Sequence, residues 1–166
     1  MRLNVSKVYC AFSSFMLAYH THEKAIMTVI IPLSLVCTSS KSHMQLFLRT
    51  CTIGHFGLFP LLFRGDELLI KVSTYLLHVL LSFYVLGRIL RNMNEKDLLT
   101  KWDNLGLIII SVVFIFCEIA HPLFLRPRNL FEFFPLMVQS ITCAVGLIIC
   151  WIQSFFIMMD SSKCIN

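Results

Sequence analysis

The densest group of polar side chains in the sequence lies between two apolar segments, at His20, His22, Glu23 and Lys24. One possible role for this group is metal binding, because a His-x-His pair can hold zinc from a loop. On a helix, however, positions i and i+2 lie on different faces. No HExxH motif and no cysteine ligand accompanies the two histidines, so we expect no metal site here.

Two other roles fit the same residues. The cluster can be a solvated loop whose charged groups reach the lipid headgroups. It can also be an anion site, in which Lys24 and a protonated histidine stabilise a phosphate leaving group while Glu23 orients a histidine or binds a sugar hydroxyl. The residue types alone leave these two alternatives open.

A few ionisable groups fall inside apolar runs, where such groups often have a function. Glu118 is one of them, and it can instead pair with Arg126 or Arg128 near the membrane surface. For His55 and His78 we expect hydrogen bonds between helices rather than catalysis.

The composition indicates which elements must position these groups. Of 166 residues, 57% are hydrophobic and 14% are charged, whereas soluble domains carry about a quarter charged residues. The mean hydropathy is +0.78. Such a chain is typical of a helical bundle in lipid, where each backbone polar group is satisfied within its own helix. The seven cysteines include no C-x-x-C pair, so we expect them to act as small apolar residues without a disulfide framework.

We predict an all-α, polytopic membrane bundle that forms a single transmembrane region over residues 1–166. A spanning helix needs about 20 apolar residues, and the chain offers about five to six such segments. The first can be read as a signal peptide, but we favour the end of a longer helix. The predicted spans are 8–19 (partial), 25–38, 44–63, 68–90, 105–125 and 131–159, and the polar segment 91–103 is expected to be a solvated cytosolic loop.

The basic residues predict the orientation of this bundle. The net charge of +5 comes from residues between the apolar runs, so we read it as a topology signal and expect no nucleic-acid partner. If the His20–Lys24 loop is luminal, nine basic residues fall on the cytosolic side and five on the luminal side. The cytosolic set is Arg2, Lys7, Lys41, Arg49, Arg88, Arg91, Lys96, Lys101 and Lys163.

A resemblance to a known family rests on two segments. The first is Tyr19-His-Thr-His-Glu-Lys-Ala-Ile26 with the following Ile31-Pro-Leu-Ser-Leu35, and the second is Gly54-His-Phe-Gly-Leu-Phe-Pro-Leu-Leu-Phe63. Both resemble segments of the dolichyl-phosphate-glucose-dependent alpha-1,3-glucosyltransferases, which glucosylate the lipid-linked oligosaccharide for protein N-glycosylation. The second segment is closer to the form found in the enzyme that adds the second glucose. The resemblance covers roughly residues 8–160 and corresponds to the C-terminal portion of a family member.

The resemblance implies a GT-C type fold in the endoplasmic reticulum membrane, crossing it several times and requiring no cofactor. The implied donor is dolichyl-phosphate glucose, the acceptor is a dolichyl-diphosphate-linked oligosaccharide, and the surrounding partner is membrane lipid. Its reaction is an inverting displacement, with an acidic base in a first luminal loop that this sequence lacks, so the catalytic residue stays unknown. We expect His22 and Lys24 to contact the donor phosphate, and His20 and Glu23 to orient the site. The alternative is a truncated, catalytically inactive paralogue that acts only as a membrane protein.

Overall fold

The computed structural model describes residues 2–18, 23–59, 68–93, 99–117 and 133–163. Within these ranges the regular elements are all helices, which confirms the predicted all-α class. The elements are α1 (Arg2–Leu17), η1 (Glu23–Ile26), α2 (Met27–Val36), η2 (Cys37–Ser39), α3 (Lys41–Leu58), α4 (Leu68–Asn92), α5 (Lys101–Ile115) and α7 (Phe134–Lys163).

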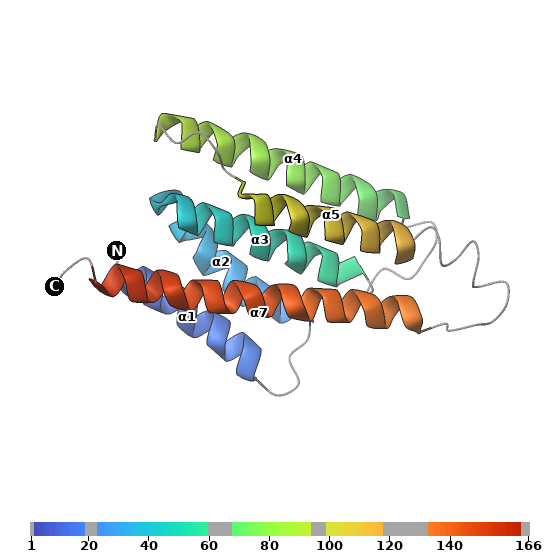
Figure 1. Cartoon of the computed structure of the whole chain (residues 1–166), viewed down its shortest axis with the longest axis horizontal. Helices are drawn as coiled ribbons and strands as arrows, with labels where there is room; N and C mark the ends of the chain where they lie inside the picture. The colour runs from blue at the N-terminus through green and yellow to red at the C-terminus, as the bar shows by residue number, and fades with distance from the viewer. Residues whose placement is uncertain (1, 19–22, 60–67, 94–98, 118–132, 164–166) are drawn as a thin grey trace, which may run out of the picture.

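The helices lie side by side as an up-and-down bundle (Figure 1). One end of the bundle, at the left of the view, holds the first residues of α1 and α3 and the last residues of α4 and α7. Lys24 lies in η1, whose Ile26 is next to Gly54 in the second half of α3. Lys7 of α1, Lys41 of α3 and Arg88 and Arg91 of α4 belong to the helix ends at the left of the view. We call this end of the bundle the basic end. That it faces the cytosol stays a prediction from the positive-inside rule.

Two helices in the described part of the chain are long and apolar enough to cross a membrane. The qualifying windows are Val72–Asn92 in α4 and Phe134–Asp160 in α7. Only 6% and 17% of these windows is buried inside the bundle, unlike the core helix of a soluble protein, so their apolar side chains face outward. The helices α2 and α5 are apolar but shorter. The predicted spans 44–63 and 105–125 run into residues 60–67 and 118–132, which lie outside the described residues.

Helix α3 is the centre of the packing. Its residues take part in three buried clusters: Leu46 packs with α1, α2 and α7, Met44 with α4, and Phe56 with α5. Polar contacts also join α7 to its neighbours. The Trp151 indole N–H donates to the Ser13 hydroxyl at 3.0 Å, and the Gln139 side-chain amide donates to the Phe56 carbonyl at 2.7 Å. Because lipid does not drive apolar helices together, such contacts and close packing hold membrane helices in place.

Small residues allow α3 and α7 to approach closely. A Cβ added at Gly146 would stand 2.7 Å from Cδ1 of Ile53, so only glycine fits there without movement. Among the described cysteines, Cys10, Cys37, Cys51, Cys143 and Cys150 carry free thiols, and Cys37, Cys51 and Cys150 are buried among the helices. Cys117 is buried as well, and its thiol donates to the Pro135 carbonyl at 3.5 Å.

The segment 91–103 differs from its prediction. Helix α4 continues to Asn92, and α5 begins at Lys101. Thr100 and Asp103 form a capping box, in which each side chain accepts a hydrogen bond from the other's backbone N–H. This cap starts the helix earlier than the apolar pattern suggested. The prediction of a solvated loop is therefore wrong for Asp103, which is buried.

Candidate functional site

The predicted phosphate-binding cluster is described only in part. His20 and His22 lie outside the described residues, as does Glu118. Glu23 and Lys24 form the first turn of η1, and the Lys24 side chain is exposed to the surroundings. The structure therefore describes the position of Lys24 but not the arrangement of the four predicted residues relative to one another.

The position of Lys24 is fixed by the helix that follows it. Helix α2 buries Val29, Ile30, Leu33 and Val36 against its neighbours, and Ile26 at the end of η1 is buried as well. This anchoring places the exposed Lys24 side chain two residues before Ile26, which lies next to Gly54 of α3. Among the described residues, no group of three His, Cys, Asp or Glu side chains is arranged to hold a metal ion.

His55 and His78 meet, but not as predicted. Their rings stack with centroids 4.0 Å apart and planes 18° from parallel. The Nδ1 atom of His55 lies 2.9 Å from the Cys51 carbonyl of its own helix. The prediction of a hydrogen bond between helices is therefore wrong for this pair, because ring stacking aligns the faces of the imidazoles rather than their nitrogen atoms.

A polar network missed at the sequence level joins three helices near the basic end. Arg49 of α3 forms an ion pair with Asp103 of α5 through its Nε atom. Its Nη1 atom donates to Gln153 of α7 at 2.5 Å, and its Nη2 atom donates more weakly to the Thr100 hydroxyl at 3.4 Å. The Asp103 carboxylate also accepts from the Thr100 backbone N–H at 2.7 Å. Arginine has enough donors in a fixed fork to serve all three partners at once.

The electrostatics of Asp103 argue against a role as a catalytic base. Burial raises the pKa of this carboxyl, but the hydrogen bonds from Arg49 and Thr100 outweigh burial and hold the pKa below its usual value. The group therefore stays ionised at neutral pH. Both of its oxygens are occupied by donors from within the bundle. We interpret the Arg49–Asp103 ion pair as a structural contact that holds α3 and α5 together.

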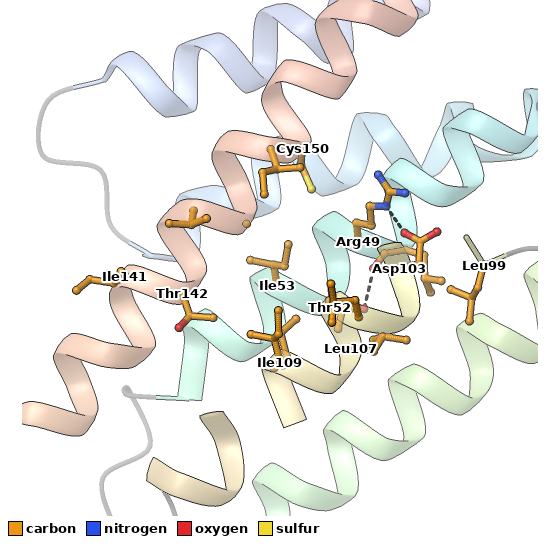
Figure 2. Close-up of a pocket in the computed structure, with 17 residues that line it drawn as sticks. Arg49, Thr52, Ile53, Leu99, Asp103, Leu107, Ile109, Ile141, Thr142 and Cys150 are labelled. Atoms are coloured by element: carbon orange, nitrogen blue, oxygen red, sulfur yellow. Dashed lines mark hydrogen bonds and ion pairs between the residues drawn. The ribbon is translucent and has the colours of Figure 1, made fainter. Parts of the chain in front are cut away.

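An apolar cavity of about 640 Å³ opens between α3, α5 and α7 (Figure 2). Arg49 and Asp103 stand at one end of it, and Thr52 and Thr142 add hydroxyl groups to walls that are otherwise aliphatic. The lining residues are Leu48, Arg49, Thr52, Ile53, Leu99, Asp103, Leu105, Gly106, Leu107, Ile109, Ile110, Ile141, Thr142, Val145, Gly146, Ile149 and Cys150. We call this cavity the groove.

Comparison with known proteins places the chain among glycosyltransferases. Residues 1–154 match the ALG6, ALG8 glycosyltransferase family. Proteins named dolichyl pyrophosphate Glc1Man9GlcNAc2 alpha-1,3-glucosyltransferase are 36% identical over 155 residues in Mus musculus and 35% identical over 148 residues in Bos taurus. The alignments cover 93% and 89% of this chain but 29% and 28% of those relatives. In Dictyostelium discoideum a relative of the same name is 31% identical, with 87% of this chain and 27% of the relative covered. No solved structure matches the chain.

Proposed function

Because the chain belongs to the ALG6, ALG8 glycosyltransferase family, we propose that it forms the C-terminal part of an alpha-1,3-glucosyltransferase. The enzyme resides in the endoplasmic reticulum membrane, which it crosses several times. It transfers glucose from dolichyl-phosphate glucose to a dolichyl-diphosphate-linked oligosaccharide that already carries one glucose. The observation that carries this proposal is the family match over residues 1–154. The chain spans less than a third of the length of the relatives it matches, so the activity belongs to a longer polypeptide.

The contribution of this chain is to bind the phosphate of the donor. In an inverting displacement the acceptor hydroxyl attacks the anomeric carbon, and dolichyl phosphate leaves with its negative charge. Cationic donors aimed at the leaving oxygen stabilise that charge in the transition state. The exposed side chain of Lys24 in η1 supports this role. His22 is the second contact, while His20 and Glu23 orient the site, and the base is supplied from outside these residues.

A chimera tests the activity without requiring the rest of the native gene. In this chimera the chain replaces the matching segment of the Mus musculus relative. The purified protein is expected to transfer glucose from dolichyl-phosphate glucose, and not from UDP-glucose, to the singly glucosylated acceptor. Transfer from UDP-glucose, or transfer only to an acceptor with no glucose, would contradict the assigned donor or acceptor.

The phosphate site makes a separate prediction in the same chimera. Lys24→Gln is expected to lower kcat/KM for dolichyl-phosphate glucose by about 100-fold, since one oxyanion-stabilising donor typically contributes about 10²–10³ in rate. The matched control is Lys7→Gln, at an exposed lysine of α1 outside the predicted cluster, which should leave kcat/KM unchanged. Equal activity of the two variants would favour the alternative in which the loop is only a solvated interfacial segment.

A further inference from the structure

The groove between α3, α5 and α7 is open toward the surroundings of the bundle. Ile109, Val145 and Ile149 line it and are each about half exposed, at 47%, 52% and 55%. These side chains project from apolar helices, one of which is long enough to span a membrane. In a bilayer, the groove between these side chains must be occupied by apolar groups, because water gains no hydrogen bonds from aliphatic walls.

The dimensions of the groove favour a narrow chain. The cavity has a volume of about 640 Å³, and its walls along α7 are too short to accommodate a helix that crosses the whole membrane. Along α7 its lining runs from Ile141 to Cys150, about 14 Å at about 1.5 Å per residue. That length is about half of a hydrocarbon core of about 30 Å, which is the depth of one leaflet.

Among the described residues, those at the polar end of the groove carry an excess of positive charge, and the segment 94–98 with Glu95, Lys96 and Asp97 lies outside them. Arg49 and Asp103 neutralise each other there, and Asp160 adds one exposed carboxylate on the last turns of α7. Against this stand Arg88 and Arg91 at the end of α4 and Lys101 on the first turn of α5, all of them exposed. Each basic side chain near a membrane surface attracts anionic headgroups.

We propose that the groove binds one acyl chain of an anionic phospholipid from the leaflet at the basic end. The acyl chain lies along α7 between α3 and α5, and the phosphate headgroup lies beside Lys101. This lipid fills the space left beside the Arg49–Asp103 pair and holds α5 against α3 and α7. The site is separate from the proposed donor-phosphate site, because neither η1, which carries Lys24, nor α2 contributes a lining residue to the groove.

Photo-crosslinking in vesicles tests the proposal. The 166-residue chain is reconstituted in phosphatidylcholine vesicles containing phosphatidylglycerol with a diazirine in one acyl chain, and the crosslinked residues are mapped by mass spectrometry. We expect crosslinks on the groove-facing residues of α5 and α7. A probe with a phosphatidylcholine headgroup should label them less, and Lys101→Gln should reduce the preference for phosphatidylglycerol about fivefold.

Two pairs of variants separate filling of the groove from general disturbance. A Cβ at Gly106 or at Gly87 meets no atom within 4 Å, but only Gly106 lines the groove. Val145 and Val85 are similarly exposed, at 52% and 48%, and only Val145 lines it. Gly106→Phe and Val145→Phe should remove most groove crosslinks, while Gly87→Phe and Val85→Phe should retain them.

Several results would overturn the proposal. One is that the groove variant and its control in each pair are labelled equally. Another is that the phosphatidylglycerol and phosphatidylcholine probes label the chain equally. A third is that protein–protein crosslinks form through the groove in place of lipid labelling. Labelling of the isolated chain that disappears in the chimera would mean that another segment of the enzyme occupies the groove, which also overturns it. Glucosyl transfer by the chimera is measured separately, so failure of the lipid site and failure of the proposed function are distinguishable.

Discussion

Arg49→Leu is expected to lower the free energy of unfolding by about 3 kcal/mol, the low end of the cost of breaking a buried ion pair. The substitution leaves the Asp103 carboxylate, whose side chain is 3% exposed, without its charged partner. The Arg49 side chain is 24% exposed, and this partial access to water is the reason for choosing the low end. Equilibrium unfolding in mixed micelles, followed by circular dichroism, measures the change.

The reverse substitution is expected to cost less. In Asp103→Leu the unpaired arginine can extend its long side chain toward the headgroups, and Thr100 still caps α5 through its own side chain. The double variant Arg49→Leu/Asp103→Leu should recover most of the loss, because removing both charges leaves no buried ion unpaired. Arg88→Leu, at an exposed arginine, is the control. If Arg49→Leu lowers the free energy of unfolding by no more than Arg88→Leu does, the Arg49–Asp103 pair does not have the structural role assigned to it.

Gly146→Val is expected to lower the free energy of unfolding by about 2–3 kcal/mol, the upper part of the usual range of about 1–3 kcal/mol for overpacking. The new Cβ would stand 2.7 Å from Cδ1 and 3.3 Å from Cγ1 of Ile53. Rotation about χ2 can move Cδ1 away, but Cγ1 moves only with χ1, at which the β-branched Ile53 is stiff. The same micelle unfolding assay measures the effect, with Gly106→Val as the control, because a Cβ at Gly106 meets no atom within 4 Å.

A milder pair of substitutions identifies the contact itself. Ile53→Val removes Cδ1, the atom closest to the added Cβ, so Gly146→Ala should cost less in the Ile53→Val background than alone. The difference is the coupling between the two positions. α3 and α7 do not meet at this point if Gly146→Ala lowers the free energy of unfolding equally in both backgrounds. The same conclusion follows if Gly106→Val lowers it as much as Gly146→Val does.

The helices could be predicted largely because apolar runs are local. Helices α4 (Leu68–Asn92) and α7 (Phe134–Lys163) overlap the ranges 68–90 and 131–159, while the crossing of a membrane by these ranges stays a prediction. The ends were harder to predict, since polar side chains do not stop a helix. Helix α1 begins at Arg2 rather than at residue 8, because the basic and polar residues of its first turns interrupt the apolar pattern without breaking the helix.

The Arg49–Asp103 pair could not be predicted in the same way. The two residues are 54 positions apart, and their meeting depends on the rotation of α3 relative to α5. The sequence carried one usable signal, the Thr100-x-x-Asp103 pattern of a capping box, which places Asp103 on a helix rather than in a loop. The groove has no sequence signal, because it results from the spacing of three helices.

The family could be predicted from short motifs, whereas the full set of residues in the donor-phosphate site could not. The resemblance in residues 19–26 and 54–63 is confirmed by the family match over residues 1–154. The roles of His20, His22, Glu23 and Lys24 stay predictions. A phosphate site needs donors that converge from several segments, and of the four residues the structure describes Glu23 and Lys24.

The measurement that tests the account most directly is a profile of lipid-linked oligosaccharides in cells that lack the Mus musculus relative. The cells receive the chimera, the relative without its matching segment, or the 166-residue chain alone. We predict that only the chimera clears the singly glucosylated intermediate, and that the chimera with His22→Ala clears it poorly. Clearance by the 166-residue chain alone would contradict the claim that the base lies elsewhere, and failure of the chimera would contradict the assignment of the chain to this enzyme.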